Sequence, residues 1–304
     1  MAPSNVALLL ALALFLPTAT PAYHAVERPL PSLTYNDGDL LTGNLNVAIM
    51  WYGNVTKVQK NKIIAFIKSI NAVRPTQPNV NNWWKVVESY QTFAGKPAGP
   101  IRVKLVNQKS DPGYSKGKVL IKDMIMALIP SLTGGNNNIL PIIVASDGVT
   151  LQNMCAGSCW QHGSLTINDK PQAYVLVGNP ENECPICAWP FVRDVHAPAG
   201  SPVLRPPSSN VAADAMVMSL AGGLMGAVTN PHGEGFYTEF RNDEVDATAS
   251  CKGAFGSGYS RGNPGKVMID RRTFGSYNVH GVARQRFLIP GVWNPKTKSC
   301  WTPL

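Results

Sequence analysis

Leu45–Tyr52 reads LNVAIMWY, an unbroken apolar and β-rich run that ends at Gly53, and it predicts a buried strand. The next segment, Val58–Val73, has apolar residues at helical spacing with lysines between them, which is typical of an amphipathic helix. A strand followed by a helix therefore begins the folded part of this chain.

The same alternation continues without a clear break or internal repeat. We expect helices at Trp83–Phe93, Val119–Ile129 and Val211–Val228, and strands at Ile101–Val106, Ile139–Ala145, Ala173–Val177, Lys266–Ile269 and Arg286–Ile289. Residues 23–44 lack periodicity and predict an extended N-terminal arm, and residues 182–207, rich in proline and cysteine, predict a disulfide-stapled loop. The sequence thus predicts one α/β or α+β domain over residues 45–304, with a mixed sheet and flanking helices.

Residues 1–22 have the layout of a secretory signal peptide. They contain no charged side chain, and Val6–Leu16 is an apolar run followed by Pro17 and small residues. A membrane anchor is the alternative, but this run is shorter than the ~20 residues that cross a bilayer. We expect cleavage after Ala22, an extracellular protein, and no membrane span.

The six cysteines favour disulfides, because an even number in an exported chain is typical of them. Spacing leaves two alternatives open for the first four, two disulfides or a four-thiolate zinc site, and an oxidising compartment favours disulfides. Sequence does not choose among the connectivities, but we expect the last two to pair and tie the tail to the body. The cysteines are Cys155, Cys159, Cys184, Cys187, Cys251 and Cys300.

The charge of the chain indicates an affinity for polyanions. The formal net charge is +9, and the signal segment contributes none of it. An acidic cell-wall polysaccharide or a cell-surface partner fits an exported protein better than nucleic acid, and solubility alone is the alternative explanation. Asn54, in the sequence Asn-Val-Thr, is the expected glycosylation site.

No complete catalytic motif is present in the sequence. Gly258–Gly262 matches the Gly-x-Ser-x-Gly pattern, but glycine and proline on both sides leave no room for the helix that a nucleophile elbow needs, so we expect a loop. His162 is interpreted as a structural hydrogen-bonding residue, because no orienting acid is identifiable. His232 and Glu234 have no third ligand. We therefore expect no catalytic residues, no metal and no cofactor, and at most a ligand cleft near these three residues.

The segment 211–228 is unusual for a helix because small residues follow one face. Gly222, Gly223 and Gly226 lie inside it, and each costs about 1 kcal/mol relative to alanine. Either a neighbouring element packs closely against this face, which we favour, or bulky functional side chains once occupied it.

Many short motifs resemble the plant EXORDIUM-like, or phosphate-induced, protein family. They occur in order from about residue 33 to the C-terminus: Met50–Gly53, Trp83–Lys85, Ala145–Asp147, Cys155–Ser164, Cys184–Phe191, Thr229–Phe236, Cys251–Gly258, Ser276–Asn278, Arg286–Pro290 and Cys300. The resemblance implies an exported protein of the plant cell wall and apoplast, linked to growth control and cell expansion. That family has no established enzymatic activity, so it supplies no catalytic residues.

A more distant resemblance concerns the glycine helix. Some zinc peptidases carry their ligands and base on a helix shortly before a turn similar to Thr229-Asn230-Pro231. Aligned on that turn, those positions fall on Gly222, Gly223 and Gly226, none of which binds a metal. This resemblance implies a zincin-like core that lacks its metal site, with a cleft left for binding.

These observations favour a non-catalytic wall protein that acts in growth signalling or matrix interaction. The alternative is a cell-wall hydrolase, either a cryptic peptidase or a glycosidase. A glycosidase needs two facing carboxylates, for which the sequence offers Asp147, Asp214, Glu234 and Glu239. A small-sugar or metabolite-binding module is a third hypothesis.

Overall fold

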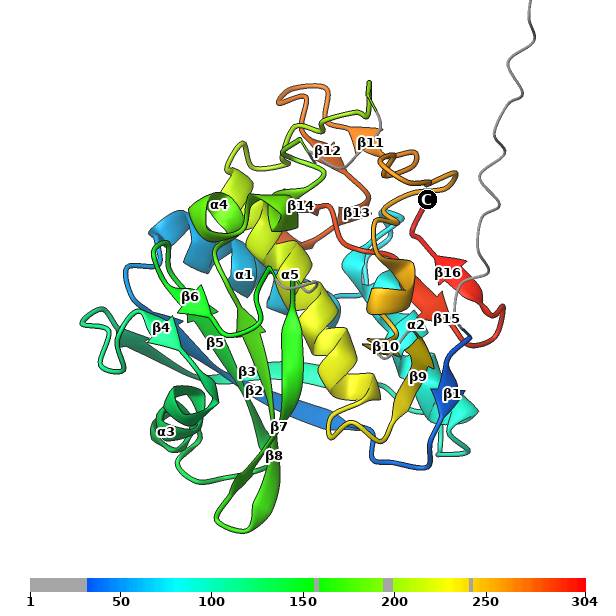
Figure 1. Cartoon of the computed structure of the whole chain (residues 1–304). Helices are drawn as coiled ribbons and strands as arrows, with labels where there is room; N and C mark the ends of the chain where they lie inside the picture. Colours follow the sequence, from blue (N-terminus) through cyan, green and yellow to red (C-terminus); the bar gives the residue numbers. More distant parts are fainter. Residues whose placement is uncertain (1–31, 156–158, 194–198, 241–242) are drawn as a thin grey trace, which may run out of the picture.

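The computed structural model describes residues 32–155, 159–193, 199–240 and 243–304. The expected signal peptide and residues 23–31 of the expected arm lie outside these ranges. Within them, the chain forms a mixed α/β domain built around one five-stranded sheet (Figure 1).

The central sheet is parallel except at one edge. Its order is β3-β2-β5-β8-β7, and β7 runs antiparallel to β8. The strands are β2 (Asn44–Tyr52), β3 (Arg102–Asp111), β5 (Ile139–Ala145), β7 (Gln161–Ile167) and β8 (Lys170–Val177). Because parallel neighbours are joined by crossovers, helices cover the sheet on both faces.

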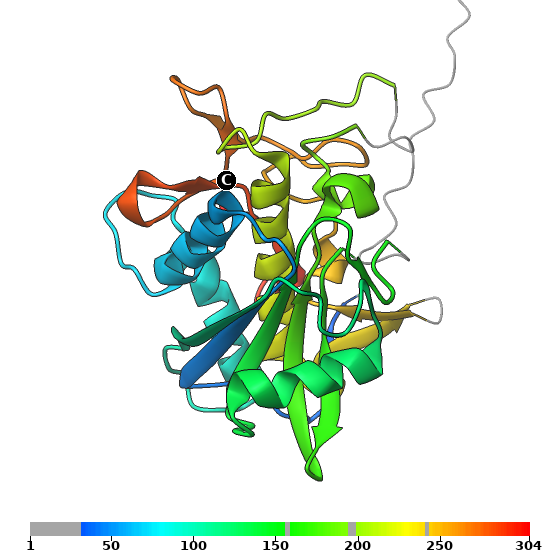
Figure 2. The same ribbon diagram turned by 90° about the vertical axis from the view of Figure 1, so that its left-hand side faces the viewer.

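Alternation along β2 shows how the two faces are divided. Leu45, Val47 and Ile49 pack in one core with helices α1 (Lys57–Ile70), α2 (Val80–Phe93) and α5 (Val211–Thr229). Ala48, Met50 and Tyr52 point to a second core under α3 (Lys122–Thr133). Figure 2 shows α3 and α5 on opposite sides of the sheet.

Helix α5 is buried over almost its whole length. All its residues except Val211 are buried, and Asn210 caps its start by accepting a hydrogen bond from the amide of Ala213. Among the described residues, α5 is the one helix that is long and apolar enough to cross a membrane, judged by length and composition alone. Here the protein itself surrounds it, since it contacts α1, α2, β7 and β8.

The C-terminal third packs against the sides of α2 and α5 that do not contact the sheet. It contains β9 (Phe236–Phe240) and β10 (Asp243–Asp246), the pairs β11 (Met268–Ile269) with β12 (Ser276–Tyr277), β13 (Val279–His280) with β14 (Arg286–Phe287), and β15 (Val292–Asn294) with β16 (Ser299–Trp301). Short β1 (Thr34–Tyr35), from the expected arm, pairs with β9. The described part of the arm is therefore attached to the domain.

Most expected elements are present, but one was misassigned and one was missed. Val119–Leu120 is not the start of a helix; it is strand β4, paired with β6 (Thr150–Leu151), and α3 begins at Lys122. Strand β7 was missed because it starts with the polar and small residues Gln-His-Gly-Ser. The expected loop, residues 182–207, is not irregular throughout. It begins inside the short helix α4 (Pro180–Glu183) and then contains the short helix η1 (Pro185–Ala188).

The cysteines form three disulfides. Cys251 is bonded to Cys300, as expected, while Cys155–Cys184 and Cys159–Cys187 join the segment before β7 to the helices α4 and η1. The Sγ atoms of Cys184 and Cys187 are 3.2 Å apart, so these two disulfides form one cluster. All four sulfurs are therefore paired as disulfides, which is the alternative that the sequence favours.

Candidate functional site

The glycine face of α5 is filled by side chains from β7, from the residue before it and from β8. A Cβ atom added to Gly222 would lie 2.6 Å from the indole of Trp160, and one added to Gly223 would lie 2.7 Å from Val175 of β8. The glycines thus let helix and sheet approach more closely than any larger residue allows. Among the described residues, close packing is therefore the interpretation that the structure supports for these glycines.

The third glycine, Gly226, adjoins a partly buried imidazole–carboxylate pair. Its added Cβ atom would meet the ring of His162 and would lie 3.0 Å from Oδ2 of Asp246. His162 Nε2 is 2.8 Å from that same oxygen. Asp246 also accepts hydrogen bonds from the Thr248 hydroxyl and from the amides of Thr248 and Ala249. The helix backbone, an imidazole and a carboxylate therefore share one closed site.

Electrostatics keep Asp246 ionised. Burial alone would raise the pKa of its carboxyl, but the hydrogen bond and charge of His162, with the bonds from Ala249 and Thr248, outweigh burial and lower that pKa. An ionised Asp246 accepts a hydrogen bond from the Nε2–H group of His162. The acid partner of His162 was not predicted from the sequence, because Asp246 follows 84 residues later.

The histidine and serine side chains near β7 do not form one catalytic relay. Ser164 Oγ lies 2.9 Å from Nδ1 of His232, whereas the carboxylate of Asp246 pairs with His162 instead. A serine nucleophile needs one imidazole that contacts both the hydroxyl and the acid. Glu234 is exposed. These residues therefore form two separate polar pairs rather than an assembled active site.

A cavity of about 90 Å³ lies beside the filled glycine face. Its walls come from Met218 and Ser219 of α5, from Trp160, and from the Cys159–Cys187 disulfide. Trp160 is therefore shared: it fills the space above Gly222 and also lines the cavity. None of the expected cleft residues, His162, His232 or Glu234, lines this cavity.

The loop between η2 (Ala249–Cys251) and β11 completes the cavity. It contributes Lys252, Gly253 and Phe255, and the segment around η1 contributes Ile186 and Trp189. The rings of Trp189 and Phe255 have centroids 5.7 Å apart. Ile186 is 43% exposed and Lys252 is exposed, so this side is the mouth. The result is an aromatic pocket with a cation at its rim.

The remaining sequence candidates lie elsewhere. Gly258–Gly262 lies in a loop, as expected, and Ser260 forms an isolated bridge with Asn263 just after it. Asp147 accepts a hydrogen bond from Asn182, and Asp214 is buried in an ion pair with Lys62. Asn54 is exposed between β2 and α1, so a glycan there has access to solvent.

The close packing gives a direct prediction for Gly226→Ala. An alanine in a helix normally stabilises by about 1 kcal/mol relative to glycine. Here we expect the free energy of unfolding to fall by about 1–3 kcal/mol, because the new methyl group overlaps the His162 ring, which Asp246 holds in place. Equilibrium unfolding in urea measures the difference.

A double-mutant cycle with His162→Ala is the control for this prediction. If the clash is the cause, Gly226→Ala becomes neutral or stabilising once the ring is removed, and the two changes are strongly non-additive. Additive effects, or a Gly226→Ala variant as stable as the parent, would contradict the assignment.

Known proteins are similar to this chain over almost the whole described domain. The conserved region described as Phosphate-induced protein 1 matches residues 33–303. Protein EXORDIUM-like 2 of Arabidopsis thaliana is 36% identical over 310 residues, covering 98% of this chain and 99% of the relative. Protein EXORDIUM of the same plant is 36% identical, covering 89% and 88%, and Protein PHOSPHATE-INDUCED 1 of Nicotiana tabacum is 34% identical with the same coverage. No solved structure matches.

Proposed function

The chain belongs to the phosphate-induced protein 1 family, and from this premise we propose that it is an exported protein of the plant cell wall that acts in growth and cell-expansion control by binding. The expected signal peptide at residues 1–22 and the disulfides support an extracellular site of action.

One observation carries the non-catalytic part of this proposal. The helix face that, by the resemblance to zinc peptidases, would carry ligands and a base is bare backbone, and Trp160 and His162 fill the space above it. These two side chains keep a substrate from reaching that face. The polar groups nearest to it, His162 and Asp246, are already paired with each other.

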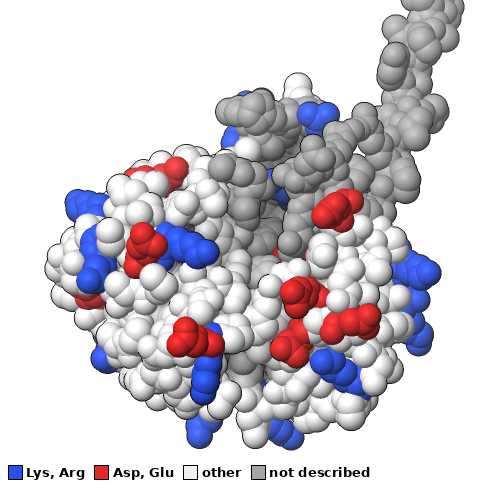
Figure 3. Space-filling view, turned by 60° about the horizontal axis from the view of Figure 1, so that its bottom comes forward, with Lys and Arg blue, Asp and Glu red and all other residues white. Residues whose placement is uncertain are grey.

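The charge of the chain supports an acidic polysaccharide as the binding partner. The net charge of +9 attracts polyanions over a distance of about 10 Å at 0.1 M salt. On the face shown in Figure 3, basic and acidic side chains are interspersed rather than gathered in one patch. A long polyanion with spaced charges, such as de-esterified pectin, fits this distribution better than a compact anion.

Retention on pectate tests the proposal. We expect the processed protein to bind immobilised polygalacturonate at 50 mM salt, and we expect binding to weaken steadily toward 500 mM salt because exposed charges are screened. Highly methyl-esterified pectin is the matched control, since it has the same backbone without most of the charge.

Two outcomes would count against the proposal. Equal retention on methyl-esterified pectin, or none at low salt, would remove the polyanion as partner. Release of new reducing ends from either polymer would replace the binding role with that of a hydrolase, which is the alternative predicted from the sequence.

A further inference from the structure

We propose that a polar trough along the amino edge of the central sheet, where its parallel strands begin, is the site that binds the acidic polysaccharide. The proposal rests on the polyanion-binding function proposed above and gives that function a place on the molecule. Two cross-strand pairs form the middle of the trough. Asn44 of β2 lies beside Arg102 of β3, and two residues further along, Asn46 lies beside Lys104. These four residues are called the amide–cation array.

Alternation along the two strands places the whole array on one face of the sheet. Leu45 of β2 lies in the core with α1 and α2, so the asparagines on either side of it face away from that core. Val103 of β3 lies in the same core, so Arg102 and Lys104 also face away from it. Helix α3 covers this face only further along the strands, over Met50 and its neighbours. The array therefore lies beside α3 and not under it.

The side chains of the array are accessible and uncommitted. Three of them are exposed and Asn46 is half-buried. Among the described residues, none of the four makes a side-chain hydrogen bond or an ion pair. Burial raises the pKa of Glu88 and the charge of Arg102 opposes this shift, but the Glu88 carboxylate accepts from the amide of Ile101. Asparagine is disfavoured in strands, so two asparagines without a structural hydrogen bond indicate a role in binding.

Three adjoining depressions extend the array into a trough. All three are lined by Asn44, and their volumes are about 270, 420 and 530 Å³. One end lies at the loop Lys96–Pro100, and the other lies at Asn137, Asn138 and Gln172, near the starts of β5 and β8. The trough thus crosses β3, β2, β5 and β8, and four neighbouring strands span roughly 14 Å. An open trough of that length suits a polymer better than one small molecule.

The chemistry of the array matches a chain of uronic acids. Amide groups both donate to and accept from sugar hydroxyls, whereas guanidinium and ammonium groups bind carboxylates. Because Arg102 and Lys104 are two residues apart on one strand, their side chains leave the sheet roughly 7 Å apart. They can therefore contact separate carboxylates of one chain, and Lys96 adds a cation at one end of the trough.

The opposite edge of the sheet is packed by loops. Open α/β sheets usually bind ligands beyond the carboxyl ends of their strands. Here a Cβ atom added to Gly53, just after β2, would meet the ring of Tyr114, and one added to Gly178, just after β8, would meet Met154. These side chains fill the space beside two of the strand ends, whereas the trough at the amino edge is open to solvent.

Calorimetric titration of the processed protein with a size-defined oligogalacturonate tests the site. We expect Arg102→Gln/Lys104→Gln to weaken binding about tenfold at low salt, because two charge-assisted contacts are lost. Lys116→Gln/Lys118→Gln is the matched control. It removes two exposed lysines with the same spacing from the loop between β3 and β4, at the opposite edge of the sheet, and should bind within about twofold of the parent.

A second variant separates hydrogen bonding from charge. We expect Asn44→Ala/Asn46→Ala to weaken oligogalacturonate binding about threefold and to leave its dependence on salt unchanged, since no charge is removed. Neither asparagine side chain holds another described residue, so the melting temperature should stay close to that of the parent. A melting temperature measured for every variant distinguishes a lost contact from a lost fold.

The outcomes separate the site from the function. If the parent does not bind oligogalacturonate, the polyanion-binding function fails and the site fails with it. If the parent binds and Arg102→Gln/Lys104→Gln binds equally well, only the location is wrong. If the control pair weakens binding as much as the array pair, affinity follows net charge, and the assignment of a site is overturned while the function stands.

Discussion

Asp214→Ala is expected to lower the free energy of unfolding by about 3–5 kcal/mol, because it leaves the Lys62 ammonium buried without a carboxylate. The Lys62 and Asp214 side chains are 6% and 2% exposed, and Lys62 Nζ lies 3.2 Å from Oδ1 of Asp214. That contact joins α1 to the first turn of α5. Burial lowers the pKa of Lys62, and the charge of Asp214 opposes this shift only in part.

The other partners of the pair explain why a lone charge is costly there. Lys62 Nζ also donates to the carbonyl of Arg286 at 2.8 Å and lies 4.7 Å from the centroid of the Phe287 ring. Oδ2 of Asp214 accepts from the amide and hydroxyl of Ser208, while Oδ1 has Lys62 as an ionic neighbour without good hydrogen-bond geometry. Removing the Asp214 carboxylate leaves the Lys62 ammonium and the Ser208 amide and hydroxyl without their anionic partner.

Equilibrium unfolding in guanidinium chloride measures the loss, and a double variant provides the control. Lys62→Met with Asp214→Leu removes both charges and keeps apolar volume, so we expect it to recover most of the stability lost in Asp214→Ala. If Asp214→Ala loses less than about 1 kcal/mol, the pair is not the buried, mutually dependent contact described here.

Replacing Cys251 and Cys300 by serine is expected to lower the free energy of unfolding by about 4 kcal/mol. The disulfide closes a loop with a sequence separation of 49, and loop-closure entropy in the unfolded chain accounts for an effect of this size. Thermal unfolding of the double variant under non-reducing conditions, compared with the parent, measures it.

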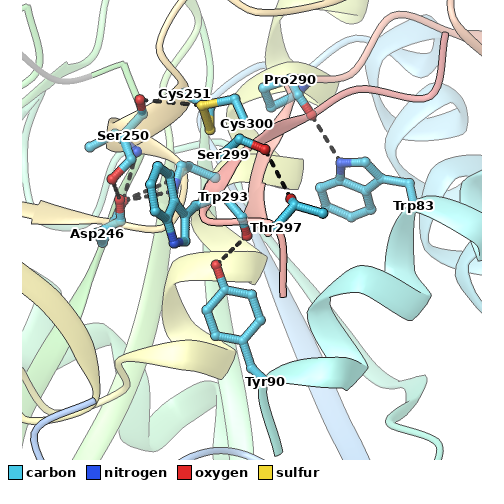
Figure 4. The surroundings of a disulfide bond; sticks show 12 residues. Trp83, Tyr90, Asp246, Ser250, Cys251, Pro290, Trp293, Thr297, Ser299 and Cys300 are labelled. Atoms are coloured by element: carbon cyan, nitrogen blue, oxygen red, sulfur yellow. Dashed lines mark hydrogen bonds between the residues drawn. A yellow bond between two sulfur atoms is a disulfide. The ribbon is translucent and has the colours of Figure 1, made fainter. Parts of the chain in front are cut away.

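The tail has other contacts, so the variant should still fold. Figure 4 shows the Tyr90 hydroxyl donating to the carbonyl of Trp293 and the Trp83 indole donating to the carbonyl of Pro290, both across to α2. Ser299→Ala is the matched control, because it removes an exposed hydroxyl beside Cys300 and should change stability by less than about 0.5 kcal/mol. An unaltered melting temperature in the Cys251/Cys300 variant would show that these contacts alone hold the tail.

The sequence alone determined the elements whose pattern is local. The apolar run of β2 and the helical spacing of α1 were both predicted, because hydrogen bonding and burial within one element repeat at a fixed period. Val119–Leu120 was misassigned because a short apolar segment fits a strand and a helix equally well.

Tertiary structure alone decided what lies against each element. The glycines of α5 were visible in the sequence, but their partner Trp160 comes from a segment with no strand pattern, and Asp246 reaches His162 across 84 residues. The cavity likewise combines α5, Trp160 and the loop at Lys252. Periodicity describes which face of an element is buried, whereas the choice of its neighbour depends on shape and charge complementarity between segments far apart in the chain.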